Sequence, residues 1–246
     1  MFEERVLANA PNTISGKISG VRFWHFLVGM PDFTLGGGRY TQVLKCMRRN
    51  SRVQRKKPVT LEMLTYVDSL RQPEDHQSIG ISCAATVGFF FLLRVSELEK
   101  LRWIDVSLFI DQDGDACLRL TLPQSKTDQY NEGHVKVLKG TSHPLCPVRA
   151  MAQWAGIQCE GKTEGEQLVF PQNIRKALAY TLKLSAVFVG DDHHRISNHS
   201  LRSGGASLMF SVGFEMEIIK RWGRWISATF HQYLWRDEYI MSNISR

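Results

Sequence analysis

The run of uncharged residues from Ile79 to Leu93 constrains the fold of this chain more than any other feature. It is fifteen residues long, mostly apolar, and followed directly by Arg94. A helix that spans a bilayer needs roughly 20 apolar residues, so this run is too short to cross a membrane. We therefore predict a helix over about 77–102, buried at the centre of a globular domain.

Composition supports a globular protein. Of 246 residues, 43% are hydrophobic and 22% are charged, which excludes a disordered or collagen-like chain. The length allows one large domain, or one full domain and a smaller one. Five cysteines without a Cys-x-x-Cys pair argue against a disulfide framework and a cysteine zinc site. We expect an intracellular protein without a signal peptide or membrane segment, nuclear if its source is eukaryotic.

The net charge of +7 is concentrated in the N-terminal quarter. Residues 1–58 hold 11 Lys and Arg against 3 acidic residues, a net of +8, and the remainder has a net of −1. A dense basic run indicates either nucleic-acid binding or a solvated basic linker. The side chains that we expect to contact DNA phosphates in this run are Arg48, Arg49, Arg52, Arg55, Lys56 and Lys57.

Sequence patterns predict a mainly α-helical protein with a small antiparallel sheet. Residues 14–50 should form one or two helices, interrupted at Pro31-Asp32 and Gly36–Gly38, and Thr60 should cap the next helix. The small core expected in this N-terminal part consists of Trp24, Phe26, Leu27 and Val28. Strands are expected at 106–110, 117–122 and 135–138, with Leu118, Leu120 and Leu122 on one face. Further helices are expected at 147–157, 172–184, 200–212, 215–221 and 227–239.

Arg94 is the first of three candidate functional positions. An arginine directly after a long uncharged run is costly unless it has an anionic partner or reaches solvent. Glu97 or Glu99 could be that partner in a purely structural ion pair, and an anionic substrate could be the partner in a functional one.

His199 and Arg202 form the second position. They lie three residues apart at the expected start of a helix, so both side chains can face the same way, and a helix N-terminus offers free N–H groups to an anion. Gly204 and Gly205 would let another backbone approach this helix closely. A helix start with ordinary surface polar groups explains the same pattern.

The third position is the segment from Trp222 to Tyr233, which includes Arg224 and Trp225. Ser227 could cap a helix that carries Tyr233. Taken alone, aromatic residues in such a segment more often belong to a core than to a functional site.

Together, the three segments resemble the tyrosine recombinase (phage integrase) family, over about Val59–Leu234. The Gly-Arg-Trp and His-Ser-Leu-Arg-x-Gly-Gly-Ala forms look most like the recombinases of eukaryotic mobile elements and some phages. The resemblance implies a recombinase catalytic domain at 58–246, after a short or partial helical core-binding domain and basic linker at 1–57. It also implies double-stranded DNA as the partner and self-association into a dimer or tetramer on DNA.

By motif, the resemblance assigns catalytic roles to Arg94, Lys126, His199, Arg202, Trp225 and Tyr233. Tyr233 matches the nucleophile, and Lys126, between the second and third strands, matches the hairpin lysine. The position usually held by histidine or tryptophan falls on Arg224 by spacing, with Trp225 beside it. We favour Trp225 for the role, because an indole N–H can donate to a phosphate oxygen, and we expect Arg224 to contact DNA.

The chemistry of phosphodiester transfer suits these residue types. Two arginines offer planar, permanently charged donors to a phosphate and can stabilise its growing charge without a metal ion. A covalent phosphotyrosine would keep the ester bond energy, so we expect no ATP and no other cofactor. Two acidic clusters, Asp111–Asp115 and Asp191–His194, could in principle bind metal, but we interpret them as loops and expect no metal site.

Two other functions fit the same residues. The chain could be a domesticated or decayed recombinase that only binds DNA, as Arg224, the short N-terminal part and the 13 residues after Tyr233 would suggest. A type IB topoisomerase-like enzyme would share the chemistry, but the Gly-Arg-Trp form favours a recombinase.

Overall fold

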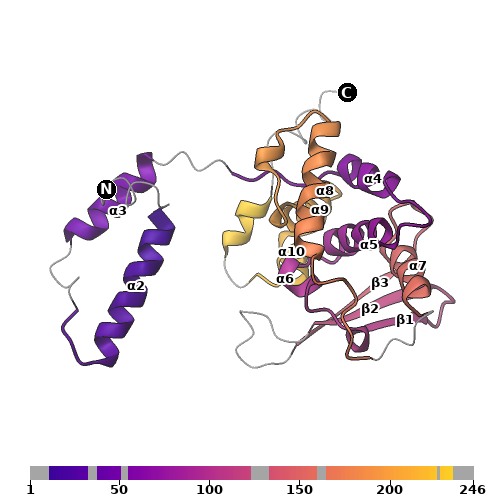
Figure 1. The fold of residues 1–246 in the computed structure, drawn as a ribbon, viewed down its shortest axis with the longest axis horizontal. Helices are drawn as coiled ribbons and strands as arrows, with labels where there is room; N and C mark the ends of the chain where they lie inside the picture. The colour runs from indigo at the N-terminus through magenta and orange to yellow at the C-terminus, as the bar shows by residue number, and fades with distance from the viewer. Residues whose placement is uncertain are drawn as a thin grey trace. The chain divides into compact units, whose positions relative to one another are not determined.

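The structure is a computed structural model that describes residues 11–32, 38–50, 55–122, 133–159, 165–225 and 228–234. The chain divides into two compact units, 1–55 and 56–246. The smaller unit contains α2 (Pro11–Leu27) and α3 (Gly38–Asn50), as the helical prediction expected (Figure 1). The small core predicted there is wrong, because its four apolar side chains are at least half exposed: Trp24, Phe26, Leu27 and Val28.

Helix α5 lies at the centre of the larger unit. It is buried from Ile79 to Phe89 except at the half-buried Ile81, so the prediction of a central core helix is confirmed. Around it pack α4, α7, α8 and α9 (Figure 1). The helices of this unit are α4 (Leu61–Ser69), α5 (His76–Phe90), α6 (Val95–Leu98), α7 (Pro147–Cys159), α8 (Ile174–Phe188), α9 (His199–Ser211) and α10 (Met216–Gly223), with short 3₁₀ turns η1 (Trp103–Asp105), η2 (His193–Arg195) and η3 (Ala228–Tyr233).

The predicted continuous helix over 77–102 is wrong in its second half. Helix α5 ends at Phe90, and Leu92 adopts a left-handed backbone with φ of 49°. A non-glycine residue in that region is strained and persists only where its surroundings hold it. Arg94 follows this turn and is the residue at the start of α6.

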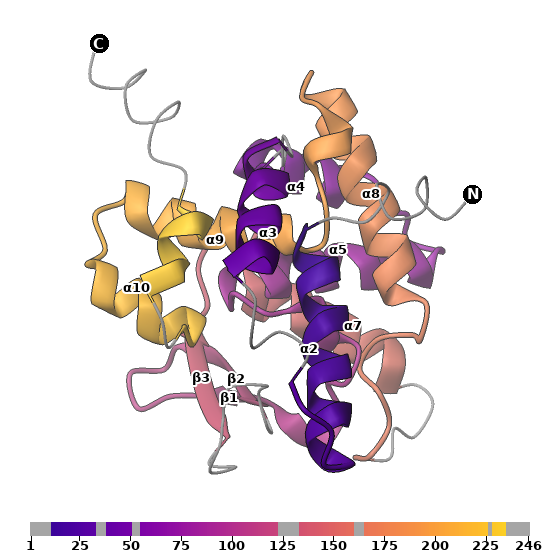
Figure 2. The same ribbon diagram turned by 90° about the vertical axis from the view of Figure 1, so that its left-hand side faces the viewer.

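The sheet has three antiparallel strands in the order β1-β2-β3: β1 (Val106–Ile110), β2 (Ala116–Leu122) and β3 (His134–Lys139). The apolar face predicted for the second strand is confirmed, since Leu118, Leu120 and Leu122 are buried. Helix α7 packs against β2 and β3, and Figure 2 shows the strands side by side below α10. The register pairs Leu120 with Lys136, which places a lysine on the buried face of β3.

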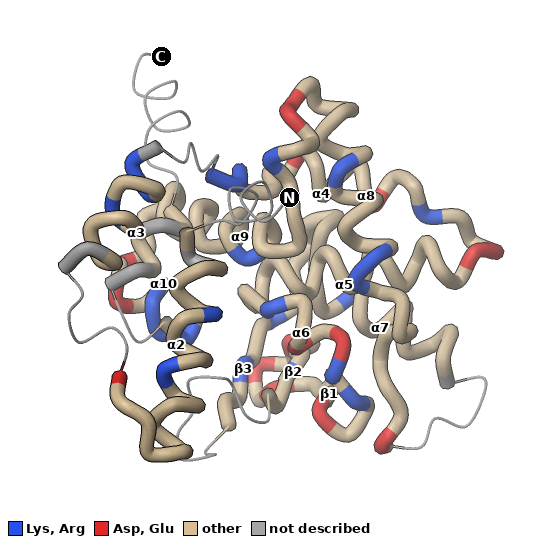
Figure 3. Tube along the Cα trace, turned by 60° about the vertical axis from the view of Figure 1, so that its left-hand side comes forward, with Lys and Arg blue, Asp and Glu red and all other residues tan. Residues whose placement is uncertain are grey.

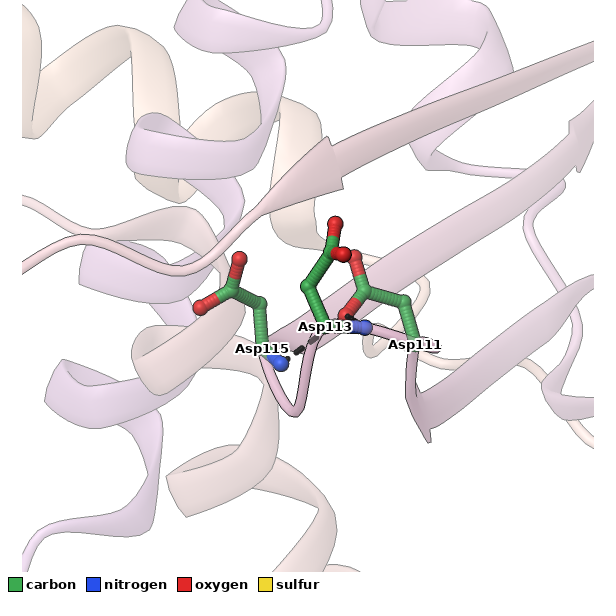
Figure 4. A group of neighbouring side chains, drawn as sticks. All are labelled: Asp111, Asp113 and Asp115. Carbon is green, nitrogen blue, oxygen red and sulfur yellow. Dashed lines mark hydrogen bonds between the residues drawn. The ribbon is translucent and has the colours of Figure 1, made fainter.

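The turn between β1 and β2 is closed by its own carboxylates (Figure 4). The Asp111 carboxylate accepts the backbone N–H groups of Asp113 and Asp115. The Lys139 ammonium pairs with all three carboxylates, at 2.7, 2.9 and 3.1 Å. The cation paired with this cluster is therefore the Lys139 ammonium, and these ion pairs connect the β1–β2 turn to β3.

Two glycines bring α9 against its neighbours, as expected from the sequence. A Cβ at Gly204 would overlap the carbonyl of Val59, and one at Gly205 would overlap the carbonyl of Phe89. The backbone before α4 also pairs with this region, since Val59 N–H donates to the carbonyl of Ser200. Thr60 then caps α4 through its side-chain oxygen, as predicted. Helix α9 is thus fixed between α5 and the start of the larger unit.

No helix within the described ranges has both the length and the apolar character needed to span a membrane.

Candidate active site

Arg202 is the most buried charged group of the site. It lies in the first turns of α9, is 2% exposed, and donates through Nη2 to the carbonyl of Gly223. Within the part of the chain that the structure describes, its Nε and Nη1 atoms have no hydrogen-bond partner. Burial, together with the nearby charge of Arg94, lowers the pKa of Arg202 to about 9, so it is still charged at pH 7. A buried cation with unused donors is costly unless an anion binds there.

Arg94 reaches the same site from the turn after α5. Its Nη1 is 2.9 Å from Oε1 of Glu97, and its backbone N–H donates to the other carboxylate oxygen. Glu97 is therefore the structural partner that the sequence left open, whereas Glu99 pairs with Arg175. The guanidiniums of Arg94 and Arg202 lie close enough for the first to lower the pKa of the second.

Glu97 also holds Arg224, which the sequence predicted to contact DNA. Arg224 is 7% exposed, and its Nη2 is 2.6 Å from Oε2 of Glu97. Burial alone would raise the pKa of Glu97, but the guanidinium of Arg224 and the amide and guanidinium of Arg94 hold it below its ordinary value. The carboxylate is thus an anionic bridge between two arginines, and the Arg224 side chain points into the unit.

His199 occupies the first position of α9, three residues before Arg202. Its side chain reaches solvent, yet partial burial of the ring and the charges of Arg202 and Arg94 lower its pKa below 6.5. The imidazole is therefore mainly neutral at pH 7, the form that can accept a proton.

Trp225 contacts both Arg202 and Tyr233. The Arg202 guanidinium carbon lies 4.5 Å from the centre of the indole ring, and the Tyr233 ring lies 5.1 Å from it. Gly223 makes room for this indole, since a Cβ there would overlap it. The Tyr233 carbonyl accepts the hydroxyl of Ser203, which joins η3 to α9. Of the two candidates for the third motif position, Trp225 is the one that touches the tyrosine ring.

A basic cavity of about 560 Å³ opens beside Trp225. Among its lining residues are Lys136 from β3 and Lys220 and Arg221 from α10. Sequence reasoning missed Lys136, because its burial follows from the register of β3 against β2 and not from the alternation of β3 itself. Leu120 is buried, and residues directly opposite in an antiparallel pair share a face, so the residue opposite Leu120 must face inward too.

Lys126 and Ser227 lie outside the described residues, so the structure places neither.

The basic residues predicted to contact DNA divide into exposed positions and positions that contact protein. Arg48 and Arg49 are exposed in the last turn of α3, while Arg52 lies outside the described residues. Figure 3 marks the Lys and Arg positions of α3 in blue.

The two lysines of the run contact other parts of the larger unit. Lys56 donates to the carbonyl of His194, and the Lys57 ammonium is 2.7 Å from the Asp191 carboxylate. Asp192 accepts the backbone N–H of His194 and so caps η2. The Asp191–His194 cluster therefore serves to anchor the chain ahead of α4, and Arg55 is exposed just before this anchor.

Comparisons with known proteins agree with this arrangement at the level of the fold. No protein-family model and no curated protein sequence matches the chain. Among solved structures, the Tn1549 transposon integrase in complex with circular intermediate DNA aligns with a TM-score of 0.60, at 12% identity, over 99% of this chain and 81% of that one. XerA recombinase aligns with a TM-score of 0.55, at 15% identity, over 91% and 80%.

A post-cleavage complex of the XerH site-specific recombinase with its difH substrate aligns with a TM-score of 0.58, at 14% identity. It is matched over 77% of this chain, which spans about half (52%) of the XerH chain. These likenesses show that the larger unit has the fold of the tyrosine recombinase catalytic domain, mainly helical with a small antiparallel sheet.

Proposed function

We propose that this chain is a DNA strand-transfer enzyme of the tyrosine recombinase type, a site-specific recombinase or integrase. The observation that carries the proposal is the state of Arg202, a buried guanidinium with two unused donors one indole ring away from Tyr233. A phosphodiester would supply the missing acceptors and would lie within reach of the tyrosine. The fold shared with DNA-bound recombinases agrees with this function.

Arg94 and Arg202 would bind the non-bridging oxygens of the scissile phosphate. Negative charge grows on these oxygens as the tyrosine attacks, and guanidinium donors fixed in place by Glu97 and the Gly223 carbonyl stabilise that charge without reorganising. Trp225 packs against both Arg202 and Tyr233 and so fixes their relative position. Its indole N–H can also donate to the phosphate.

Tyr233 would be the nucleophile. Its oxygen forms a bond to phosphorus while the bond from phosphorus to the 5′ oxygen breaks, which leaves a 3′-phosphotyrosine and a free 5′ hydroxyl. The neutral imidazole of His199 would accept the phenolic proton, and Lys126 would give a proton to the departing 5′ oxygen. Attack of a 5′ hydroxyl on the phosphotyrosine reverses these steps and rejoins DNA, so the cycle consumes no ATP.

Double-stranded DNA is the proposed partner, and we propose that the chain assembles into a dimer or tetramer on it. The exposed arginines at the end of α3 would contact the phosphate backbone, which adds affinity without reading sequence.

A covalent adduct tests the function. Duplexes selected by mobility shift from a randomised pool, and then nicked near each candidate phosphate, would be incubated with the protein and run on SDS gels. We expect an adduct with the starting protein and none with Tyr233→Phe, which should still shift DNA. An adduct of undiminished yield with Tyr233→Phe would refute the mechanism.

Two results separate the alternative functions, one from this experiment and one from a plasmid assay. Shifted DNA without an adduct on any nicked substrate would identify a decayed recombinase that only binds DNA. Relaxation of supercoiled plasmid regardless of sequence would instead select a topoisomerase-like activity.

A further inference from the structure

Lys136 is a buried lysine on a strand whose valines face outward. It is 4% exposed, whereas its neighbours Val135 and Val137 are 62% and 40% exposed. Hydrophobicity alone would turn this strand the other way round, so the observed register carries the cost of burying an amine. The buried amine must therefore make contacts that offset its desolvation.

Those contacts are two backbone carbonyls. The Nζ atom lies 2.6 Å from the oxygen of Phe91 and also donates to the oxygen of Trp222. Phe91 follows the last residue of α5, and Trp222 belongs to the last turn of α10, where helices leave carbonyls without partners. One side chain of β3 thus binds the carboxyl ends of two helices.

Both helix ends lead into strained turns. Among the described residues, the non-glycine positions with positive φ are Leu92, at 49°, and Arg224, at 57°. The first follows the Phe91 carbonyl directly, and the second comes two residues after the Trp222 carbonyl. Those same turns deliver Arg94 and Trp225 to the proposed active site.

Trp222 strengthens the same junction. Its indole N–H donates to the carbonyl of Phe90 at 3.0 Å, and its ring stacks on Phe91. The Nζ of Lys136 lies 4.8 Å from the centre of that ring. The ends of α5 and α10 are therefore joined at this one place by a lysine and a tryptophan.

We propose that Lys136 is a positioning residue for the active site, which clamps the ends of α5 and α10 and thereby fixes Arg94 and Trp225. The role is distinct from that of Lys126, which the family resemblance assigns to proton transfer. The hydrogen-bond donors of Lys136 carry the role, and its positive charge does not.

The electrostatics agree with a role for donors. The pKa of Lys136 is lowered to about 6, first by burial and then by the charges of Arg224, Arg202 and Arg94. The carboxylate of Glu97 opposes this shift only in part. The amine is then mainly neutral at pH 7 and has two hydrogens, which match the two carbonyls.

Three substitutions separate donors from charge. Lys136→Met removes both, Lys136→Gln keeps neutral N–H donors on a side chain one bond shorter, and Lys136→Arg keeps N–H donors together with a permanent charge. The matched control is Lys139→Met, on the same strand but exposed and paired with the Asp111 hairpin. All four variants would be compared with the starting protein for adduct formation at saturating DNA and for DNA affinity.

We expect Lys136→Met to slow adduct formation about 100-fold, as a misplacement of about 1 Å at a reacting group does, with DNA affinity nearly unchanged. Lys136→Gln should recover part of the rate and Lys136→Arg should recover less. Recovery by glutamine would show that neutral donors suffice, whereas recovery by arginine together with none by glutamine would overturn the assignment of the role to donors without charge. A rate for Lys136→Met equal to that of the control would overturn it as well.

This kinetic readout depends on the proposed function, so a second readout is taken without DNA. The amides of Leu93 and Trp225 donate to helix carbonyls and should exchange slowly with deuterated solvent. Lys136→Met should accelerate exchange in both turns together while β1 is unchanged. Unchanged exchange in the turns would overturn the proposal, even if the starting protein forms no adduct. If neither Lys136→Gln nor Lys136→Arg restores the rate of adduct formation, faster exchange in Lys136→Met would still support it.

Discussion

Two donors of Arg202 lie inside the protein without an acceptor among the described residues, while the third group of the same guanidinium binds the Gly223 carbonyl. This one side chain links α9, the end of α10 and the indole of Trp225. At the residue scale, the proposed site therefore depends on small clearances around Trp225, and Gly223 is the tightest of them.

Gly223→Ala tests that clearance. The added Cβ would overlap the indole of Trp225 and push it away from Arg202 and Tyr233. We expect adduct formation to slow by about 100-fold, measured at saturating DNA. Gly156→Ala is the control, because a Cβ there meets open space within α7 and should leave the rate unchanged. Equal rates for the two variants would show that the indole does not position the tyrosine.

His199 gives a pH dependence with a definite sign. Burial and the neighbouring arginines lower its pKa below 6.5, so the proton-accepting form predominates at pH 7. The rate of adduct formation at subsaturating DNA reports on the free protein. Between pH 8 and 5 this rate should fall as protons bind, with a midpoint below 6.5, and His199→Gln should lack that step. A midpoint above 6.5 would contradict a role for the arginines in keeping the imidazole neutral.

At the scale of elements, α9 owes its place to close backbone approaches. Gly205 faces the carbonyl of Phe89, which belongs to α5 and cannot move aside as a flexible side chain could. We expect Gly205→Ala to lower the free energy of unfolding by about 1–3 kcal/mol, the usual cost of overpacking. Urea denaturation measures the change, with Gly156→Ala as the reference. A free energy of unfolding for Gly205→Ala that is not below that of the reference would mean that α9 is free to shift.

Sequence patterns predicted most of these elements because their signals are local. The Thr60 cap and the alternation around Leu120 both depend on neighbours in the chain. The break after Phe90 carries no such signal, because Phe91, Leu92 and Leu93 continue an apolar run and only tertiary contacts hold Leu92 left-handed.

The same limit explains the errors in the site. Motif spacing pointed to Arg94, His199, Arg202 and Tyr233, and the structure places the other three close enough to Arg202 for their charges to interact. Lys136 could not be assigned in that way, since its burial follows from the pairing of β3 with β2. The burial of Arg224 depends on Glu97, a partner 127 residues away.

At the scale of the whole molecule, the basic surplus divides into exposed and protein-facing parts. Arg48 and Arg49 are exposed on α3, whereas Lys57 pairs with Asp191 in the larger unit. We expect replacement of both arginines by glutamine to reduce the slope of log affinity against log salt by about 2, because each phosphate that the protein neutralises contributes about 0.9 to that slope. Lys57→Gln should leave the slope unchanged. Equal slope changes from the two substitutions would contradict this division.

The most direct test of the central claim is to identify the residue that becomes joined to DNA. The adduct formed on a nicked duplex would be digested with protease and nuclease, and the nucleotide-bearing peptide sequenced by mass spectrometry. We predict a single phosphodiester link on Tyr233, carrying the nucleotide through its 3′ end. A link to any other residue, or through a 5′ phosphate, would contradict the proposed mechanism.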